Sequence, residues 1–368
     1  GTILAIGSPY QYGYRGHTKV FQWDGSEWLQ KGNTIIGTSL RCKSGQSVAL
    51  SADGTVLIIT EPHNYSYVNS GNIYRYEWNG SEWLQKGDPI VTNLHSKINN
   101  ISLSPDGNII SFIYNNNGIV YDWDTYGWKL RESTIFENTS DIVVTNDVIL
   151  SSSQQDSKEY LKVLSGFTLH TIPDPIRNTI SDYDTTFYVG QYTTNDLFIA
   201  VVIPGMFAGL VTIYRYDTLT REMISVGRIF GTSEDKIGEI ITISGDGRTI
   251  AASPDRPENI YTKIYYFNGS ESDPKWLQKG DPIKSTNLNT STASMSLSHD
   301  GNTLVISTTG PTSNPCNEEL TSFDDVYSRG MTVIFQWNGS EWLQKGNNII
   351  QQNFEIITDS VNRPLYVS

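Results

Sequence analysis

The stretch WNGSEWLQKGDPI, Trp78–Ile90, occurs four times in the chain with small changes. Close copies begin at Trp23 and Trp337, and a looser copy, FNGSESDPKWLQKGDPI, begins at Phe267. Repetition over such intervals is typical of propellers, solenoids and other repeat proteins. The phrase also predicts local structure, because an alternating segment precedes Asn79-Gly80, and Asn-Gly is the strongest short signal of a hairpin. We therefore expect a strand on each side of this turn.

A second recurring phrase precedes the hairpins and reads SVALSADGTVLIIT at Ser47–Thr60. Similar phrases begin at Asn100, Ile240 and Ser294. Each has an alternating apolar run on both sides of Ser-x-Asp-Gly, and alternation with period two is the strand signal. Asp-Gly supplies the positive φ of a tight turn. Each unit therefore holds four antiparallel strands, which we name A, B, C and D in chain order.

These units predict the architecture. They cover approximately residues 46–91, 97–136, 141–172, 182–231, 237–284 and 293–351. The chain opens with GTILAIGSPY, a strand B without its A, and closes with NRPLYVS, a strand A without its B. Pairing the two ends would close a ring and remove open sheet edges. We expect a single all-β domain, a seven-bladed β-propeller of four-stranded antiparallel blades, with blade 1 split between residues 1–37 and 361–368.

The composition argues against several classes of partner. The chain has 26 Lys and Arg against 39 Asp and Glu, a formal net charge of −13, which disfavours nucleic acid or an anionic membrane surface. No apolar run reaches the roughly 18 residues that span a bilayer. The chain begins at Gly1 without Met, so we expect a processed product or a fragment. Two cysteines, Cys42 and Cys316, make no disulfide framework, and whether they are bridged stays open.

Aromatic residues recur at fixed places in the hairpin. Tyr76 and Trp78 are two apart on strand C and share one face, and Trp83 follows on strand D. We interpret these residues as packing between blades. The alternative is a ring of Trp platforms for sugars, as in a lectin-like propeller. The Lys of LQKG, for example Lys86, falls on the outermost strand, where a charge discourages association between sheet edges.

We predict neither a catalytic nor a metal site. The histidines are isolated, and no Cys-x-x-Cys pair, nucleophile elbow or phosphate-binding loop occurs. One insertion, residues 310–329 between strands B and C of the last blade, is a candidate functional loop. Its carboxylates could do acid–base chemistry only if they were close together and partly desolvated, and a solvated acidic loop is the alternative. These carboxylates are Glu318, Glu319, Asp324 and Asp325.

We place the partner-binding surface on the third to fifth blades, residues 100–230, or on that insertion. These blades have lost parts of the common wording and have gained PDPIRN, which contains Arg177, and the apolar IPGMFAGL, which contains Met206 and Phe207. An exposed apolar loop would be a natural contact patch. Neutral drift is the alternative explanation of their divergence.

Asn-x-Ser/Thr sequons at Asn64, Asn79, Asn268 and Asn338 are candidates for N-glycosylation. In three of them, Asn79, Asn268 and Asn338, the hairpin turn already explains the Asn-Gly-Ser sequence. Glycosylation also requires a eukaryotic secretory route. We therefore favour the turn interpretation.

Short sequences after strand B indicate a family. GSP at Gly7–Pro9, TEP at Thr60–Pro62 and ASP at Ala252–Pro254 follow the A–B phrase, and Phe230-Gly231 keeps the letters FG. In blade pattern, the whole chain resembles the FG-GAP repeats of integrin α-subunit heads and of many secreted microbial proteins. The wording resembles a branch in surface proteins of marine microbes, algae and their large viruses.

This resemblance implies a non-catalytic adhesion or scaffold module, outside the cell or on a virion or other particle surface, that binds a protein or glycan and belongs to a larger assembly. A carbohydrate-binding, lectin-like propeller is the alternative. A hydrolase or lyase with a site in the central channel is less favoured, although the fold itself does not decide the matter.

The chain departs from the integrin pattern at the A–B turn. Integrin-type repeats have a calcium loop with several Asp residues there. In this chain Asp53, Asp106, Asp246 or Asp300 is the only carboxylate of its turn. Calcium takes six to eight oxygen ligands, so we expect these turns to bind no metal and the protein to need no cofactor.

Overall fold

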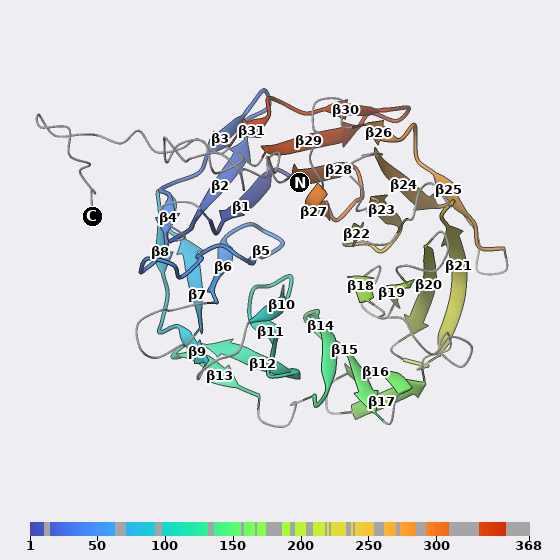
Figure 1. Cartoon of the computed structure of the whole chain (residues 1–368), viewed down its shortest axis with the longest axis horizontal. Helices are drawn as coiled ribbons and strands as arrows, with labels where there is room; N and C mark the ends of the chain where they lie inside the picture. Colours follow the sequence, from blue (N-terminus) through green and yellow to red (C-terminus); the bar gives the residue numbers. More distant parts are fainter. Residues whose placement is uncertain are drawn as a thin grey trace, which may run out of the picture.

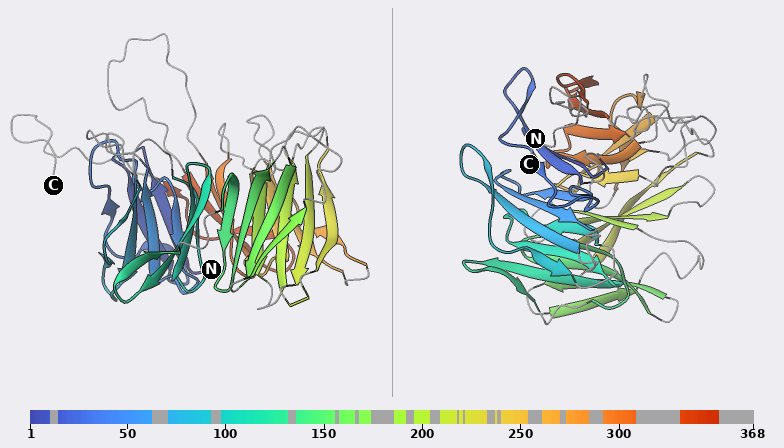
Figure 2. Two further views of the ribbon diagram at one scale, coloured as in Figure 1. Left: turned by 90° about the horizontal axis from the view of Figure 1, so that it is seen from below. Right: turned by 60° about the vertical axis from the view of Figure 1, so that its left-hand side comes forward.

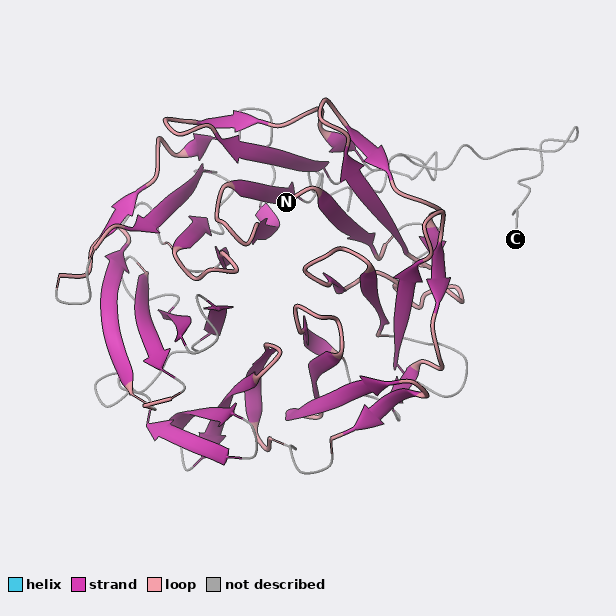
Figure 3. Cartoon of the chain, turned by 180° about the vertical axis from the view of Figure 1, so that it is seen from behind, coloured by secondary structure: helices cyan, strands magenta, loops and turns pink. Residues whose placement is uncertain are grey.

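The computed structural model of the chain is built from β-strands joined by turns and loops, and Figure 3 colours no helix in the part of the chain that it describes. The structure describes residues 1–10, 15–62, 71–92, 98–131, 136–155, 158–165, 168–173, 186–191, 196–203, 209–217, 219–220, 222–232, 237, 240–253, 261–269, 273–284, 292–308 and 331–350.

Seven small antiparallel sheets stand side by side in a ring around a common axis (Figure 1). In each sheet, strands A to D follow one another from the axis outward in chain order, and in four sheets a short last strand pairs back with strand C. The predicted seven-bladed β-propeller is therefore confirmed. The strands that come first in each unit lie nearest the axis, and the short strands that begin with Trp lie at the rim in the blades that have them.

The first three blades have the following strands. Blade 1 consists of β1 (Ile3–Ser8), β2 (His17–Trp23), β3 (Trp28–Gln30) and β4 (Ile35–Ile36). Blade 2 consists of β5 (Val48–Leu50), β6 (Val56–Glu61), β7 (Gly71–Trp78), β8 (Trp83–Gln85) and β9 (Ile90–Thr92). Blade 3 consists of β10 (Asn99–Leu103), β11 (Ile109–Tyr114), β12 (Asn117–Asp124) and β13 (Gly127–Leu130).

The remaining blades continue the ring. Blade 4 consists of β14 (Thr139–Val144), β15 (Val148–Gln155), β16 (Lys158–Ser165) and β17 (Thr168–Pro173). Blade 5 consists of β18 (Thr186–Gln191), β19 (Asp196–Ile203), β20 (Leu210–Asp217) and β21 (Met223–Phe230). Blade 6 consists of β22 (Ile240–Ile243), β23 (Thr249–Ser253), β24 (Tyr261–Phe267), β25 (Trp276–Gln278) and β26 (Ile283–Lys284). Blade 7 consists of β27 (Thr292–Leu297), β28 (Thr303–Thr308), β29 (Met331–Trp337), β30 (Trp342–Gln344) and β31 (Ile349–Ile350).

Strand D differs from the expectation of one continuous strand. In blade 2, β8 pairs with the end of β7, and β9 pairs again with its beginning. The chain bends away between them at Lys86-Gly87, where Gly87 has a φ of 69°, and the Gln85 side chain donates to the Gly87 carbonyl at 3.2 Å. Blades 1, 6 and 7 repeat this interruption. The outer edge is therefore a strand of three residues, too short to template pairing with another sheet.

The predicted closure of the ring involves residues 361–368, which lie outside the described residues. Within the described chain, blade 1 begins with β1, which pairs with β2, whereas blades 2 to 7 each have a strand A on the inner side of strand B. The closure by the C-terminal segment stays a prediction.

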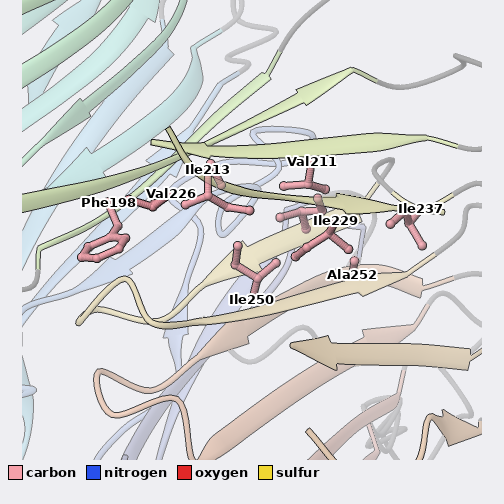
Figure 4. Close-up of a cluster of buried hydrophobic side chains, with 10 residues drawn as sticks. Phe198, Val211, Ile213, Val226, Ile229, Ile237, Ile250 and Ala252 are labelled. Atoms are coloured by element: carbon pink, nitrogen blue, oxygen red, sulfur yellow. The ribbon is translucent and has the colours of Figure 1, made fainter. Parts of the chain in front are cut away.

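The hydrophobic core lies between the blades. Strand B is the most buried, and all six residues of β6 are buried because each of its two faces meets a neighbouring blade. One cluster joins blades 5 and 6 and includes Phe198, Ile213, Val226 and Ile250 (Figure 4). Comparable clusters join blades 1 and 2, 2 and 3, 3 and 4, 4 and 5, and 6 and 7. The ring is stabilised by removing this apolar surface from water.

The strands of every blade run between the two faces of the disc (Figure 2). Because neighbouring strands are antiparallel, the A–B and C–D turns lie on the same face, and the B–C and D–A connections lie on the other. We call these the turn face, which contains Asp53 and Asn79, and the loop face, which contains the segment Gly37–Gly45. The two faces carry different chemistry.

Candidate functional site

The aromatic pairs predicted from the repeats meet across strands C and D. Trp78 lies opposite Trp83 in the register, and their ring centroids are 5.5 Å apart. The same pairing occurs in four other blades. These pairs are Trp23–Trp28 at 5.5 Å, Trp123–Trp128 at 5.0 Å, Phe267–Trp276 at 5.6 Å and Trp337–Trp342 at 5.6 Å.

Each pair contacts strand D of the preceding blade, at its bend where that strand has one. The Trp83 indole N–H donates to the Lys31 carbonyl at 3.0 Å, and a Cβ on Gly32 would stand 2.5 Å from the Trp78 ring. The glycine is needed because the ring occupies the space of a side chain. The same indole bonds run from Trp28 to Lys345 at 3.1 Å, from Trp342 to Lys279 at 2.8 Å and from Trp276 to Val226 at 3.0 Å.

The Lys of LQKG belongs to this contact between blades, which corrects the expectation that it mainly guards the outer edge. The Lys31 ammonium lies 4.9 Å from the centroid of the Trp78 ring, and Lys345 lies 5.1 Å from that of Trp23. Lys279 is buried and donates to the Gly301 carbonyl and to Asn302 Oδ1 in blade 7, both at 2.8 Å. The aromatic faces and turn carbonyls of the next blade attract the cation inward.

Blade 2 makes the equivalent contact from another strand. Arg75 on β7 is buried, donates to the Gly107 carbonyl of blade 3, and lies 4.3 Å from the Trp123 ring centroid. Its Nη2 also forms an ion pair with Glu77 at 2.9 Å. Lys86, the residue of the repeat, is exposed. Of the four repeated lysines, Lys86 is thus the one that keeps the predicted exposed position.

These contacts decide between the two interpretations of the aromatic residues. Trp83 is only 2% exposed, and the indole N–H groups of four blades are used by carbonyls of the neighbouring blade. The interpretation as packing between blades is confirmed for these rings. Neighbouring lysines and glycines contact these rings, and the lectin-like propeller stays an alternative.

In the Ser-x-Asp-Gly turns, the Asp carboxylate accepts hydrogen bonds from residues of the same turn. Asp53 Oδ1 accepts from the Ser51 hydroxyl at 2.6 Å and from the Thr55 N–H at 3.0 Å. The Ser51 hydroxyl in turn accepts from the Val56 N–H at 3.0 Å. The bond from Ser51 holds the pKa of Asp53 below its usual range, against the opposing effect of burial. In the part of the chain that the structure describes, no three His, Cys, Asp or Glu side chains gather as metal ligands would.

The Asn-Gly-Ser turns are Asx turns. Asn79 Oδ1 accepts from the Ser81 N–H at 2.8 Å, from its hydroxyl at 3.0 Å and from the Glu82 N–H at 2.9 Å. Asn338 makes the same three bonds, and both residues are exposed. The turn interpretation is therefore confirmed for Asn79 and Asn338. Their glycosylation stays a prediction, as does that of Asn268, which is also exposed.

The same turn carries different side chains in blades 3 and 5. Asp124 Oδ1 accepts from the Tyr126 N–H at 2.7 Å, and Asp217 Oδ1 accepts from the Leu219 N–H at 2.8 Å. Tyr126 and Leu219 thus occupy the position that Ser26, Ser81 and Ser340 occupy in blades 1, 2 and 7. They are 95% and 72% exposed. Large apolar side chains project from the turn face where the repeated blades project a hydroxyl.

All seven predicted partner-binding residues fall outside the described residues. These are Arg177, Met206, Phe207, Glu318, Glu319, Asp324 and Asp325, together with the sequon Asn64 and with Cys316. Their roles stay predictions. Cys42 is described, and its buried thiol donates to the Arg15 carbonyl at 3.1 Å.

The segment Gly37–Gly45 on the loop face is a candidate that the motif search missed. Its start is fixed by the buried carboxylate of Glu61, which accepts from the Thr38 N–H at 2.9 Å and from the Thr38 hydroxyl at 2.6 Å. Its middle is fixed by Cys42, whose thiol pKa is raised by burial and by the nearby Glu61. Arg41 and Lys43 flank this cysteine. The signal in the sequence is a local excess of positive charge in an acidic chain.

Comparison with known proteins gives the fold. No family model matches the chain, and no curated protein matches it. Membership of the FG-GAP family therefore stays a proposal. No helix suited to crossing a bilayer occurs in the described ranges.

Several solved structures are similar. A putative 6-phosphogluconolactonase from Bacteroides uniformis ATCC 8492 has a TM-score of 0.63 at 12% identity over 96% of this chain and 97% of that one. The β-propeller domain of Cps50 (Swd1) from Myceliophteria thermophila has a TM-score of 0.52 at 12% identity over 82% and 85%. Atg21, in its complex with the coiled coil of Atg16, has a TM-score of 0.51 at 12% identity over 83% and 98%. At this identity the likeness supports the β-propeller fold and assigns no activity.

Proposed function

We propose that this propeller is a non-catalytic binding or structural module that acts as an adhesion or scaffold component outside the cell or on a particle surface. The resemblance of the repeat sequences to FG-GAP repeats supports a location outside the cell or on a particle surface. The contacts between blades support the absence of catalysis from the repeated residues, because their Trp, Lys and Asp side chains hold the ring together. The fold serves as a protein-binding scaffold elsewhere, as the complex of Atg21 with a coiled coil illustrates.

One observation carries the proposal, namely that two equivalent turns on the turn face replace serine with exposed Tyr126 and Leu219. Water-exposed Tyr and Leu at turn tips gain most from a partner that buries them. Both belong to blades 3 to 5, which we call the divergent arc. We propose that the partner-binding surface lies on the turn face of this arc. Met206 and Phe207 belong to a B–C connection and thus to the loop face, and their role stays a separate prediction.

The test uses the serines of the repeated blades as a guide. The double substitution Tyr126→Ser and Leu219→Ser copies Ser81 into both turns and leaves the Asx hydrogen bonds in place. The matched control is Leu84→Ser with Leu343→Ser, which removes side chains that are 46% and 47% exposed on blades 2 and 7. Each immobilised protein is cross-linked to extracts of its native source, and the captured proteins are quantified by mass spectrometry.

We expect the first variant to lose a specific captured partner, the control to retain it, and both to melt like the unsubstituted protein. Equal capture by all three proteins would contradict the placement on the divergent arc. Equal loss in both variants would indicate non-specific apolar adhesion and would also contradict it.

A further inference from the structure

The first 52 residues differ in charge from the rest of the chain. They contain five basic residues, Arg15, Lys19, Lys31, Arg41 and Lys43, and two acidic residues, Asp24 and Glu27. Over the whole chain the acidic residues prevail, 39 to 26. Asp24 and Glu27 lie in a C–D turn and thus on the turn face. Arg15, Arg41 and Lys43 lie in the connections of the loop face. Their two segments, 9–16 and 37–47, contain no acidic residue, and the buried Glu61 carboxylate that contacts them is bonded to Thr38.

The backbone beneath these cations is tightly packed. The two segments are joined by hydrogen bonds from the Gly37 N–H to the Gly16 carbonyl at 3.0 Å and from the Ser44 N–H to the Arg15 carbonyl at 2.9 Å. A Cβ on Gly16 would overlap the Ser44 carbonyl oxygen, and a Cβ on Gly37 would overlap that of Arg15. Such close approach of two backbones requires glycine. The cations therefore stand on a preorganised base, which lowers the entropic cost of binding.

Arg41 and Lys43 have an unusual backbone conformation on either side of a buried cysteine. Their φ angles are 66° and 54°, a left-handed conformation that is unfavourable for residues other than glycine. Between them, Cys42 is fully buried and anchors the turn. Arg41 is exposed and Lys43 is partly exposed. Residues held in such backbone conformations cluster at binding sites, where surrounding structure compensates for the strain.

An aromatic ring completes the arrangement. The Lys43 ammonium lies 5.5 Å from the centroid of the Tyr10 ring, and Tyr10 is 56% exposed. The Nε–H of Arg15 donates to the Gly37 carbonyl, which fixes its guanidinium group beside the same segment. Lys43 is thus in contact with Tyr10, Arg15 is bonded to the same segment, and Arg41 lies two residues from Lys43 on the loop face of blade 1.

From this arrangement we infer that the segment Gly37–Gly45, with Arg15 and Tyr10, binds an anionic polysaccharide. The sulfate or carboxylate groups pair with Arg15, Arg41 and Lys43, and a sugar ring lies against the exposed part of Tyr10. Guanidinium groups suit the planar or tetrahedral oxyanions of such sugars. The net charge of −13 opposes an extended contact with any polyanion, so we expect the contact to be limited to this segment. The exposed ring of Tyr10 is the feature that favours a sugar chain.

This inference rests on the proposed function as a binding module, and it names a ligand class for a second surface. The test measures binding of the full chain to dextran sulfate and to polygalacturonate by isothermal titration calorimetry at low salt. Unsulfated dextran and vesicles containing phosphatidylserine are the comparison ligands. The two anionic polysaccharides distinguish a sulfate ligand from a carboxylate ligand.

The decisive variant is Arg41→Gln with Lys43→Gln, and the control is Lys86→Gln with Lys129→Gln, which removes two exposed charges elsewhere. We expect the first variant to weaken binding about 30-fold, as the loss of two exposed charge contacts of about 1 kcal/mol each implies. The control should change affinity less than about threefold. Tyr10→Ser should weaken polysaccharide binding without affecting the melt.

The inference is overturned if neither anionic polysaccharide binds, if the control loses as much affinity as the Arg41 and Lys43 variant, or if the vesicles bind as tightly as the polysaccharides. Failure of polysaccharide binding, together with loss of partner capture in the Tyr126 and Leu219 variant, would refute this site and leave the proposed function standing.

Discussion

The two halves of the ring pack their blades together in different ways. We call blades 6, 7, 1 and 2 the repeated arc and compare them with the divergent arc. At the contacts between blades 6 and 7, 7 and 1, and 1 and 2, a Trp pair meets the bend of the preceding blade, its indole N–H reaches a carbonyl, and a cation covers a ring, as in the contact of Lys31 with Trp78 and Trp83. Between blades 4 and 5, aliphatic side chains such as Leu150, Val163 and Ile199 form the contact.

This difference in packing explains why only the repeated arc keeps the same sequence motif in each blade. The Trp contact constrains both sides of an interface, because the ring needs a glycine opposite it and the indole N–H needs a carbonyl at a fixed distance. An aliphatic contact constrains volume and polarity alone, so many sequences satisfy it. The divergence of blades 3 to 5 therefore indicates a different kind of packing, with freedom left for the outer turns to acquire Tyr126 and Leu219.

The transitions between the arcs are intermediate. Gly227 of blade 5 still lies against Trp276, which donates to the Val226 carbonyl, but Val226 replaces the lysine. At the other boundary, Gly87 still lies against Trp123, but within the described residues the buried Trp128 indole N–H has no hydrogen-bond partner. At the two boundaries of the repeated arc, the contact between blades therefore lacks the lysine or the indole hydrogen bond. Between blades 4 and 5, in the part that the structure describes, the aromatic pair is absent as well.

The largest expected effect comes from breaking the contact in the repeated arc. Gly280→Ala places a Cβ 2.6 Å from the Trp337 ring at a φ of 75°. We expect the free energy of unfolding to fall by about 2 to 5 kcal/mol, from left-handed strain together with overpacking. Urea unfolding measures this loss.

Gly339→Ala is the matched control, because Gly339 has a φ of 108° and nothing lies within 4 Å of a Cβ there. It carries backbone strain alone, about 1 to 2 kcal/mol. Equal losses in the two variants would mean that the Trp ring does not constrain position 280, and the explanation of the repeated wording would be wrong.

The second effect concerns pH. His17 begins strand C of blade 1, is 3% exposed, and has its pKa lowered from 6.5 to about 4, chiefly by burial and further by Lys19. Because the folded pKa lies below the unfolded one, the unfolded chain binds the proton first as pH falls. Stability at this site is constant above about pH 7 and is lost between about pH 6.5 and 4, by on the order of 2 to 3 kcal/mol.

The measurement compares the free energy of unfolding at pH 7 and pH 4.5 for the unsubstituted chain and for His17→Gln. The carboxylates titrate in both proteins, so the difference between them isolates His17. The variant should lose less stability on acidification. An identical loss in both would show that His17 is protonated without cost in the folded state.

The fold could be predicted from the sequence because its signals are local. Alternation marks the strands, Asp-Gly and Asn-Gly mark the turns, and identical wording in four places requires equivalent surroundings. Lys279 shows the limit, because the same residue type is buried in blade 6 and exposed as Lys86 in blade 2, where Arg75 takes its place. Which cation turns inward depends on the neighbouring blade, which no local pattern contains.

The candidate segment on the loop face could not be predicted from local sequence patterns, for a related reason. The segment Gly37–Gly45 is shaped by Gly16, Arg15 and Glu61, which are distant in the sequence and have no shared motif. The residues at the turn tips could partly be predicted from the sequence, because Tyr126 and Leu219 align with Ser81 once the Asx turns are aligned. Their exposure became clear only when the turns were placed on the outer part of the ring.

A third effect tests the cation of the repeated arc. Lys279→Met keeps the length of the side chain but leaves the Gly301 carbonyl and Asn302 Oδ1 without their donor. Burial lowers the pKa of Lys279, while Asp300 and Asp246 oppose that shift. We expect a loss of about 1 to 3 kcal/mol in the free energy of unfolding, the cost of an unpaired buried acceptor. Lys86→Met, at the exposed equivalent, should change stability by less than about 0.5 kcal/mol. If Lys279→Met leaves the free energy of unfolding unchanged, the lysine only fills space at this contact.

The smallest expected effect is that of calcium, and it applies to both arcs, because Asp53 and Asp300 lie in the repeated arc and Asp106 in the divergent one. Each turn offers a single carboxylate, and that carboxylate already accepts bonds from its own serine and backbone, as in the bond from Ser104 to Asp106 and from the Asn108 N–H at 3.0 Å. A calcium ion would have to break these bonds and find the rest of its six to eight oxygens in water. Thermal melts in millimolar calcium and in excess chelator should therefore coincide. A calcium-dependent rise of several degrees would show that the turns recruit ligands from elsewhere. Asp106→Asn measured beside Asp53→Asn would then show whether the ion binds in both arcs or in only one.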